Sequence, residues 1–384
     1  MRVGVVGSGI GGLCSAVGLQ RAGADVLVFE QATDLRPGGS GLSVFANGVR
    51  AMDALGVGDR FREIASAEVR ELRGGQRRPD GSWLSTMPMD ALAELRVVDR
   101  TDLHGMLEAE LHDGTLVPGT VVTDARPDGT LVRRGADGRE SCDRFDLIVA
   151  ADGLRSTVRA TWPDDPGVRY AGYSAWRGIT EHAMDLRGEA GETWGVGHRF
   201  GMAPLADGRV YWFAVATMPA EQTFPDEAAT LRERFGHWHD PIPALIDVTR
   251  ADRIRRLPIS ELARRLGSFR RGRIVLLGDA AHAMTPNLGQ GGGQAMEDAA
   301  TLAVLLASAG SSSREAPDAM LTRYDTLRRP RSQLVAKRSR AVGRLAHVRG
   351  RAASGLRDFV VSRTPQRALR RRLAWLQDWE PPIR

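Results

Sequence analysis

Three short segments that are almost entirely apolar lie far apart along the chain, at residues 3–6, 146–151 and 273–277. Each runs directly into a glycine-rich or acidic turn. Such apolar runs are typical of parallel strands that are covered on both faces. Because ligands bind at the carboxyl ends of the strands in an open α/β sheet, we expect the three turns to converge on one ligand.

The first segment begins a strand–helix–strand unit. Apolar residues at helical spacing over residues 13–22 predict a helix, Gly23 is a typical helix stop, and residues 26–29 predict the second strand.

The middle and the end of the chain have different patterns. Residues 170–255 contain aromatic and alternating runs, notably at 210–215, which predict antiparallel strands in a second sheet. Residues 70–95 resemble an early excursion into the same sheet. Residues 317–384 have a helical pattern, with expected breaks at Pro365 and Pro381.

Length and composition indicate a globular protein. At ~150 residues per domain, the 384 residues correspond to about two to three domains, and 42% hydrophobic with 26% charged residues excludes wholesale disorder. Two cysteines, Cys14 and Cys142, cannot form a disulfide framework, which is typical of a reducing cytosol. No apolar run approaches the ~18 residues of a spanning helix. We therefore expect a cytoplasmic protein with no integral membrane association.

The formal net charge is +6, from 53 basic and 47 acidic residues, and the basic excess lies in 328–351 and 367–372. No zinc-ligand set or RNA-binding aromatic signature accompanies it, so no nucleic-acid partner is expected. Leu369, Leu373 and Leu376 recur among arginines, which leaves a membrane-surface helix open. We favour packing or self-association of these helices, in a monomer or a homodimer.

After the first strand, Gly7, Gly9 and Gly12 fill a G-x-G-x-x-G frame. The first glycine makes a tight turn, the second lets a pyrophosphate approach the backbone, and the third allows close helix–sheet packing. Glu30 ends the second strand and can accept both hydroxyls of an adenosine ribose. The frame predicts an adenine dinucleotide site, with a merely glycine-rich turn as the alternative, and it does not distinguish FAD from NAD.

Two later motifs favour FAD. Asp152 and Gly153 follow the second apolar segment, and residues 278–286 follow the third. Asp279 is suited to accept the hydroxyls of a ribityl chain. The loop at 289–293 can present N–H groups to a ring carbonyl on which negative charge builds during reduction.

With these three motifs in order, the chain resembles the single-component FAD-dependent aromatic hydroxylases, the para-hydroxybenzoate hydroxylase-like flavin monooxygenases, over nearly its whole length. The resemblance implies an α/β fold. A discontinuous Rossmann-like FAD-binding domain of the glutathione-reductase type would carry an inserted mixed or antiparallel β-sheet substrate domain and a C-terminal helical segment. The expected boundaries are 1–69, 97–165 and 266–325 for the FAD-binding domain, 70–96 and 166–265 for the substrate domain, and 326–384 for the C-terminal helices.

The resemblance also implies roles for single residues. Arg100 matches an arginine that contacts FAD, with a surface helix-capping residue as the alternative. Pro286 would lie beside the isoalloxazine ring near the oxygen site. The expected cofactor-binding residues are Gly7, Gly9, Gly12, Glu30, Arg100, Asp152, Gly153, Asp279, Pro286, Gly289, Gln290, Gly291 and Gly292.

The activity implied by the resemblance is that of an FAD-dependent NAD(P)H monooxygenase. NAD(P)H, bound transiently without a Rossmann domain of its own, would reduce a tightly but non-covalently bound FAD, and substrate would promote a flavin movement that gates this step. Reduced FAD and O₂ would form a C4a-hydroperoxide that hydroxylates an aromatic or heteroaromatic small molecule. The protein would orient the substrate and exclude water, and no metal is expected.

Candidate substrate residues come from separate segments. Arg177 and Arg199 could anchor an anionic substrate or the nicotinamide phosphates. Tyr211 and Phe213 would share one sheet face and could wall the pocket, with an ordinary core or surface position as the alternative. The expected substrate residues are Phe45, Asn47, Arg199, Tyr211 and Phe213, and the expected catalytic residues are Pro286, Arg177 and Tyr211.

Three further residues invite a chemical role. Asn287 stands where some relatives carry an acid, and an amide cannot act as a base. We interpret His282 as a turn histidine packed beside the cofactor loop rather than as a base. We interpret Cys14 as buried and inert, although its place near the phosphates leaves a lowered thiol pKa open.

Four other classes of protein share some of these features with the hydroxylase. An NAD-dependent dehydrogenase shares the first motif but does not need the other two. An FAD-dependent epoxidase or reductase acting on a non-aromatic, polyketide or terpenoid substrate stays open, as does a non-catalytic flavoprotein. A halogenase is disfavoured because Trp375 and Trp379 do not match the Trp-x-Trp-x-Ile-Pro signature, and the only lysine, Lys337, lies in a late basic helix.

Overall fold

The computed structural model describes residues 1–34, 40–92, 94–309 and 316–382. The three apolar segments form adjacent parallel strands, β1 (Arg2–Val6), β11 (Leu147–Ala150) and β18 (Ile274–Leu276). Their carboxyl ends therefore meet at one edge, as the pattern predicted. The six-stranded sheet has the order β17-β18-β11-β1-β2-β7 and is completed by β2 (Asp25–Phe29), β7 (Leu116–Val117) and the antiparallel β17 (Arg270–Arg271).

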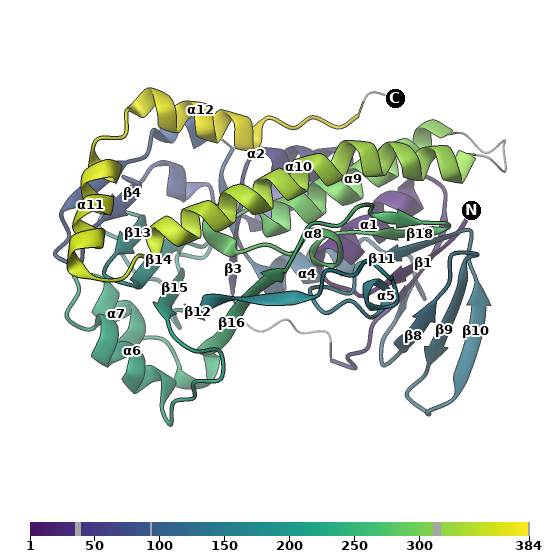
Figure 1. Cartoon of the computed structure of the whole chain (residues 1–384), viewed down its shortest axis with the longest axis horizontal. Coiled ribbons are helices and arrows are strands. Elements are labelled where there is room, and N and C mark those ends of the chain that lie inside the picture. The colour runs from purple at the N-terminus through teal and green to yellow at the C-terminus, as the bar shows by residue number, and fades with distance from the viewer. Residues whose placement is uncertain (35–39, 93, 310–315, 383–384) are drawn as a thin grey trace.

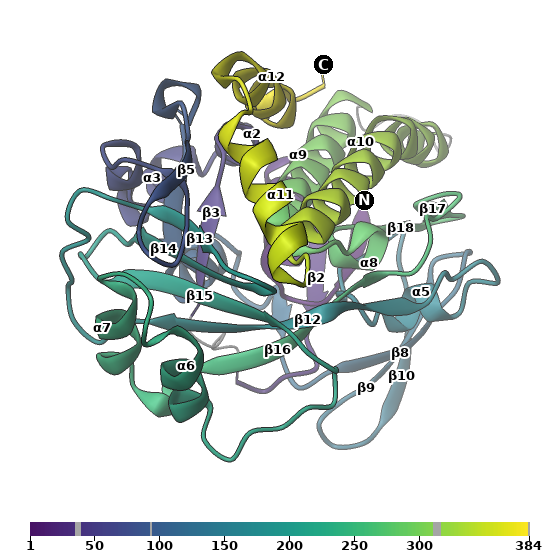
Figure 2. The ribbon, with the colours of Figure 1, turned by 60° about the vertical axis from the view of Figure 1, so that its left-hand side comes forward.

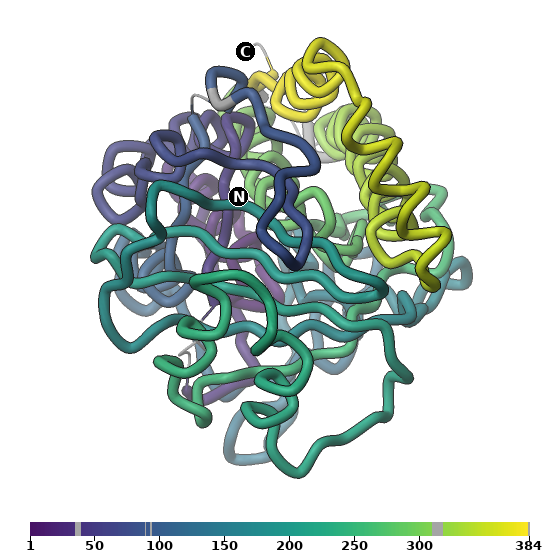
Figure 3. Tube along the Cα trace, turned by 90° about the vertical axis from the view of Figure 1, so that its left-hand side faces the viewer, coloured from purple at the N-terminus to yellow at the C-terminus, as the bar shows by residue number. Residues whose placement is uncertain are grey.

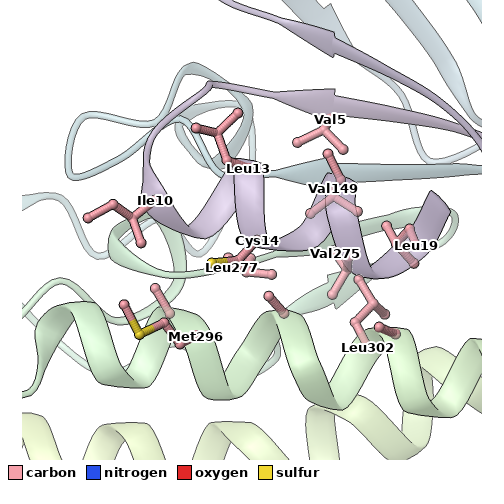
Figure 4. Packing of buried hydrophobic residues seen from close by; sticks show 14 of the residues in the cluster. Val5, Ile10, Leu13, Cys14, Leu19, Val149, Val275, Leu277, Met296 and Leu302 are labelled. Carbon is pink, nitrogen blue, oxygen red and sulfur yellow. The ribbon is translucent and has the colours of Figure 1, made fainter. Parts of the chain in front are cut away.

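Helices α1 (Ile10–Arg21) and α9 (Gly291–Ala309) pack together against this sheet. Leu13 and Leu19 of α1 are fully buried, and Figure 4 shows them between the strands and α9. The helix begins at Ile10, three residues earlier than predicted, because the carbonyl of Gly9 already accepts the Leu13 N–H at 2.9 Å. The N-terminus of α1 therefore lies inside the glycine motif.

An antiparallel meander covers the sheet on the side away from α9, as Figure 1 shows. It consists of β8 (Val121–Ala125), β9 (Thr130–Arg134) and β10 (Glu140–Arg144). Phe29 and Phe145 meet edge to face at 5.9 Å, and the Arg133 guanidinium lies 5.2 Å from the Phe29 ring. The sheet is thus buried on both faces, which explains its uninterrupted apolar strands.

A second, mixed sheet of seven strands has the order β16-β12-β15-β14-β13-β4-β5. Its long central strands are β12 (Val168–Ile179) and β15 (Val210–Thr217), whose bounds include the alternating run seen in the sequence. The early excursion supplies the edge hairpin of β4 (Gly75–Arg77) and β5 (Trp83–Thr86). The remaining strands are β13 (Gly191–Trp194), β14 (His198–Pro204) and β16 (Arg255–Leu262).

The end of the chain is helical. Helix α10 (Ala316–Ala346) packs on α9, and it continues through Pro330 without a break. Helices α11 (Arg351–Ser362) and α12 (Gln366–Gln377) then lie across the second sheet and beside its β4–β5 hairpin (Figures 2 and 3). Pro365 precedes α12 as predicted, whereas the break before α11, at Gly350 with φ +85°, had not been predicted.

The shorter elements connect these layers. Strands β3 (Gly41–Val44) and β6 (Arg96–Asp99) form a separate two-stranded antiparallel sheet. Among the described residues, no helix is long and apolar enough to cross a bilayer. The domain boundaries given above stay a prediction. The other elements are α2 (Ala46–Ala54), α3 (Gly58–Ile64), α4 (Arg100–Glu108), α5 (Thr157–Ala160), α6 (Glu227–Phe235), α7 (Ile242–Asp247), α8 (Asp279–His282), and the 3₁₀ turns Glu68–Arg70, Met89–Leu92, Ala251–Arg253 and Pro286–Leu288.

Candidate active site

A cavity of about 340 Å³ opens where the carboxyl ends of β1, β11 and β18 face the second sheet. One end is lined by the turns after these strands and by the N-termini of α1 and α9. The other end is lined by side chains of β12, β14 and β15. The cavity lining thus has a backbone-rich part and a side-chain-rich part.

The three glycines of the first motif serve different purposes. Gly7 has φ +95°, and a Cβ added to Gly12 would lie 2.0 Å from the Gly7 carbonyl oxygen. Backbone conformation at Gly7 and a backbone collision at Gly12 therefore exclude a side chain, whether or not a ligand is bound. A Cβ on Gly9 would meet no atom within 4 Å, and Gly9 lines the cavity. The space beside Gly9, at the N-terminus of α1, is where the geometry can receive a phosphate.

Glu30 lies at the end of β2, next to this helix N-terminus. Its Oε2 accepts hydrogen bonds from the Ser8 N–H at 2.8 Å and the Ser8 hydroxyl at 3.0 Å. Its Oε1 accepts from the Ala32 N–H at 2.9 Å. These bonds fix the carboxylate, and each carboxylate oxygen retains further acceptor capacity for ribose hydroxyls.

The second helix N-terminus at the cavity belongs to α9. Gly289 adopts the left-handed conformation, with φ 61° and ψ 25°, which turns the chain into the helix. A Cβ on Gly291 would meet nothing within 4 Å, whereas Gly292 packs against Leu42. Gly289, Gln290, Gly291 and Gly292 all line the cavity, so backbone N–H groups of this 19-residue helix face it.

Three charged side chains meet at the middle of the cavity. Arg100, Arg177 and Asp279 all line it, and neither guanidinium has a hydrogen-bond or ion-pair partner among the described residues. Burial and the neighbouring Arg177 lower the pKa of the Arg100 guanidinium, and Asp279 opposes this. Two cations facing one carboxylate favour a ligand that offers electronegative oxygens.

The aspartate of the second motif stabilises a turn. Asp152 Oδ2 accepts the Val158 N–H at 3.2 Å, and its Oδ1 is buried without a hydrogen-bond partner. Burial raises the pKa of the Asp152 carboxyl above its ordinary value. Gly153 lines the cavity, while Asp152 lies behind it.

Arg199 of β14 is 2% exposed and lines the opposite end of the cavity. Its Nη2 donates to Asn287 Oδ1 at 2.9 Å, and its Nη1 lies 3.4 Å from Glu192 Oε2. Its Nε and Nη1 are buried and make no hydrogen bond among the described residues. Asn287 also donates to the Tyr173 hydroxyl at 2.9 Å, so this amide holds the guanidinium in place.

Aromatic and apolar side chains surround Arg199. Tyr211 and Phe213 lie on one face of β15 and both line the cavity, with ring centroids 6.2 Å apart. The Arg199 guanidinium carbon lies 5.6 Å from the Phe213 ring. Burial raises the pKa of the Tyr211 hydroxyl, so this group stays protonated at neutral pH. Ala175, Val215 and Met284 complete this wall.

Several predicted cofactor-binding residues lie outside the cavity lining, namely Gly7, Gly12, Glu30 and Asp152, and so do Asn47, Phe45 and His282. Asn47 is fully buried and donates from Nδ2 to Gln290 Oε1 at 2.9 Å and Glu297 Oε1 at 2.6 Å. Phe45 packs behind Gly289, where a Cβ would approach its ring at 3.1 Å. His282 is buried with Nε2 2.6 Å from Asp298 Oδ2. The structure therefore gives the side chains of Asn47, Phe45 and His282 packing partners and does not bring them to the cavity.

Asn47 and His282 belong to a buried ionic cluster that joins α8, α9 and α10. Arg328 donates from Nε to Asp298 Oδ1 at 2.6 Å and from Nη1 to Glu297. Arg331 donates to Glu297 Oε2 at 2.7 Å. Part of the basic excess in 328–351 is therefore internal, and the sequence had not indicated these partners.

Some lining residues had not been predicted. Val215 and Ala175 follow the same two-residue alternation as Tyr211–Phe213 and Arg177, so the strand period could have identified them. Leu42 and Ser43 of β3 had not been named as site residues, although they lie just before the expected substrate residue Phe45 in the chain. Cys14 is buried in the core, and burial raises the pKa of its thiol to about 12, which agrees with an inert role.

The FAD binding domain family matches residues 1–339 of the chain. The chain belongs to this family. Among similar members, "Aurachin C monooxygenase/isomerase" of Stigmatella aurantiaca is 41% identical over 92% of this chain and 92% of its own length. "2-heptyl-3-hydroxy-4(1H)-quinolone synthase" of Pseudomonas aeruginosa is 32% identical over 97% of this chain and 96% of its own. A solved structure, Klebsiella pneumoniae HpxO with FAD and uric acid, superposes with a TM-score of 0.86 at 27% identity, covering 98% and 96% of the two chains.

The cavity of this family member fits FAD. Open space at Gly9 and Gly291 would be filled by a Cβ, and the N-termini of two helices face it. Both features suit a ligand that presents electronegative groups to the two helix N-termini. The predicted family, fold class and FAD cofactor are confirmed, and the chain is an FAD-dependent monooxygenase of aromatic or heteroaromatic compounds.

Proposed function

We propose that the chain uses NADH or NADPH and O₂ to hydroxylate a 4(1H)-quinolone that carries an apolar substituent. The observation that carries this proposal is Arg199 at the apolar end of the cavity: among the described residues its buried Nε has no partner, and its buried Nη1 has only the Glu192 carboxylate at 3.4 Å. Leaving such donors unpaired is costly, so they call for an acceptor on the ligand. The carbonyl oxygen of a planar ring is an acceptor of this kind.

The surroundings of Arg199 favour a ring with little other polar character. Ala175, Phe213, Val215 and Met284 offer no hydrogen-bonding side-chain group to a ligand other than the weak thioether sulfur. A purine such as uric acid presents several polar edges and would leave some of them unpaired against this wall. The name of a relative that covers 97% of the chain, a 2-heptyl-3-hydroxy-4(1H)-quinolone synthase, supports the same substrate class.

Arg199 also has a chemical consequence. When a 4-quinolone loses its N–H proton, negative charge spreads over the carbonyl oxygen and the neighbouring ring carbon. A guanidinium beside the oxygen stabilises the deprotonated form. The ring carbon then becomes electron-rich, which suits the acceptance of an electrophilic oxygen.

We assign the cofactor-side residues as follows. Gly9 and the α1 N-terminus receive the phosphates, Glu30 the adenosine ribose, Asp279 the ribityl hydroxyls, and the N-terminus of α9 the ring carbonyl on which negative charge builds during reduction. Bound FAD supplies the activation of O₂. Arg100 and Arg177 hold its oxygens, and Pro286, Tyr211 and Phe213 exclude water around the substrate. The net reaction consumes substrate, O₂, NAD(P)H and a proton and yields hydroxylated product, NAD(P)⁺ and water.

The test is anaerobic reduction of the FAD enzyme by NADH and by NADPH, alone and with 2-heptyl-4(1H)-quinolone, uric acid or salicylate. We expect the quinolone to accelerate flavin bleaching most, and admission of air to yield a product one oxygen heavier. Acceleration by uric acid instead would contradict the substrate class. Equal reduction rates with every compound, and no oxygenated product, would contradict the substrate-gated hydroxylase.

A further inference from the structure

A second cavity, of about 420 Å³, lies beside residues 170–173 of β12, earlier along the strand than the part that lines the candidate active site. Its walls come from β12, β16 and the C-terminal end of α10, which Figure 2 shows close to these strands. Four arginines line this basic cleft: Arg169, Arg340, Arg344 and Arg349. The cleft is therefore strongly positive, and nothing described so far uses it.

Only two of the four arginines have a carboxylate partner. Glu261, which is 3% exposed, accepts from Arg169 Nη2 at 2.8 Å and from Arg340 Nε at 2.6 Å. Arg344 and Arg349 are exposed and have no hydrogen-bond or ion-pair partner within the described part of the chain. Two guanidinium groups are thus free to bind an anion.

A buried histidine also faces the basic cleft without partners. The His347 ring stacks on Tyr173, with centroids 4.0 Å apart and 18° between the planes. Both of its ring nitrogens are buried and make no hydrogen bond among the described residues. Burial, and next the charge of Arg199, lower the pKa of His347 to about 3, so the ring is neutral and offers one donor and one acceptor. Since unpaired buried groups are costly, a polar ligand at this position would relieve the cost.

The two cavities share a wall. Along β12, residues 170–173 line the basic cleft, whereas Ala175 and Arg177 line the candidate active site. Thr285 lines the cleft, and its neighbours Met284 and Pro286 line the active-site cavity. Two residues of a strand span about 7 Å, so the linings of the two cavities come about that close along β12.

We propose that the basic cleft binds the phosphate groups of the reductant NAD(P)H through Arg344 and Arg349, with His347 and Arg340 at its inner end. This inference rests on the proposed function, which requires NAD(P)H as electron donor. The chain contains one G-x-G-x-x-G frame, at Gly7–Gly12, and we assign that frame to FAD. The reductant therefore needs another phosphate site, and arginine forks match phosphate oxygens.

The test measures the dissociation constant of the reductant by anaerobic rapid-reaction reduction of the FAD enzyme with saturating quinolone. For the double variant Arg344→Ala/Arg349→Ala we expect the constant for NAD(P)H to rise at least about tenfold. The limiting reduction rate, the FAD content and the dissociation constant of the quinolone should stay near the wild-type values. Replacement of both arginines by lysine should recover part of the affinity, because the charge remains.

Lys337→Ala is the matched control, since Lys337 is exposed on the same helix and lies outside the cleft lining. It should leave all constants unchanged. An equal loss for NADH and NADPH in the double variant would assign the arginines to the pyrophosphate, and a loss for NADPH alone would assign them to its 2′-phosphate. Titration with inorganic pyrophosphate gives an independent readout, because pyrophosphate should compete with NAD(P)H in the wild type and not in the double variant.

Failure of the two proposals can be distinguished. If wild-type enzyme is not reduced by NADH or NADPH, the proposed reductant is wrong, and the assignment of the basic cleft as an NAD(P)H site is then wrong as well. If wild-type enzyme is reduced and the double variant binds NAD(P)H as tightly as the Lys337→Ala control, only the inference about the basic cleft is wrong.

Discussion

At the scale of single residues, Gly9 and Gly12 belong to one motif but are glycine for different reasons. A side chain on Gly9 would enter the cavity, whereas a side chain on Gly12 would collide with the protein backbone. Gly9 has φ −62°, which alanine can adopt, and its Cβ would enter the open space assigned to a phosphate. We predict that Gly9→Ala folds as the apoprotein and loses most of its FAD. Flavin absorbance of the purified protein, with the melting temperature of the apoprotein, measures both effects.

Gly12→Ala is the contrasting variant, because its Cβ would collide with the Gly7 carbonyl oxygen. It should lower the melting temperature of the apoprotein itself. Full FAD occupancy in Gly9→Ala would contradict the assignment of the phosphate site.

Arg199 allows a second prediction at this scale. Its donors that lack a hydrogen bond among the described residues are assigned to the substrate oxygen. A hydrogen bond to a charged group contributes about 1.5–3 kcal/mol. We expect Arg199→Met to weaken quinolone binding by roughly tenfold to a hundredfold. FAD content should not change. Spectral titration of the flavin with quinolone measures this affinity.

The control for Arg199→Met is Arg264→Met, because Arg264 is exposed and lies outside both cavity linings. Unchanged quinolone affinity in Arg199→Met would remove the observation on which the substrate assignment rests.

Single residues were predictable where a motif or a strand period fixes them. Tyr211 and Phe213 share a face because side chains alternate along a strand, and both line the cavity. Asn47 was expected near the substrate, yet its amide binds Gln290 and Glu297. The position of Asn47 in the sequence gives its distance from a motif along the chain. It does not give the rotation of helix α2, which depends on polar partners such as Glu297 of α9.

At the scale of elements, the buried ionic cluster is what ties α10 to α8 and α9. Burial alone would raise the pKa of the Asp298 carboxyl, but His282 and Arg328 outweigh it and lower the pKa below its ordinary value. A carboxyl whose pKa is lower in the folded than in the unfolded protein stabilises the fold at pH values above its ordinary pKa of about 3.9. This stabilisation is lost as the pH falls from that value through the lower pKa of the folded state.

We predict that Arg328→Met destabilises the fold by about 3–5 kcal/mol, because it leaves Glu297 and Asp298 buried without this partner. The Asp298 pKa should rise, so acid unfolding should begin at a higher pH than in the wild type. Chemical denaturation between pH 3 and pH 7 measures both. Arg329→Met is the control, since its partner Asp325 is nearer the surface and such pairs contribute about 1 kcal/mol or less. Equal stability loss in the two variants would contradict this account.

Elements with a local signal were predicted well. The strand–helix–strand unit and the breaks at glycine and proline follow from period and backbone geometry. The packing of α10, α11 and α12 was not predictable, because a helical period identifies an apolar face without naming its partner. Pro330 shows the limit of local rules, since α10 continues through it.

At the scale of the whole molecule, the site exists only because two sheets meet. The parallel sheet brings three turns from distant parts of the sequence to one edge, and the strands of the mixed sheet lie beside it (Figure 1). Arg199, Tyr211 and Phe213 of the mixed sheet line the same cavity as these turns. The sequence indicated each half, since apolar strands predict the first sheet and alternating strands the second. The placement of one sheet relative to the other depends on packing between segments that are distant in the sequence, so it cannot be predicted from local sequence patterns.

The central claim is that this assembly transfers one oxygen atom from O₂ to a quinolone ring. The most direct measurement is mass spectrometry of the product formed from 2-heptyl-4(1H)-quinolone under isotopically labelled O₂ in ordinary water, with NAD(P)H as reductant. We predict a hydroxylated product that carries one labelled oxygen atom. A product whose new oxygen is unlabelled, or consumption of NAD(P)H that yields only hydrogen peroxide, would contradict the claim.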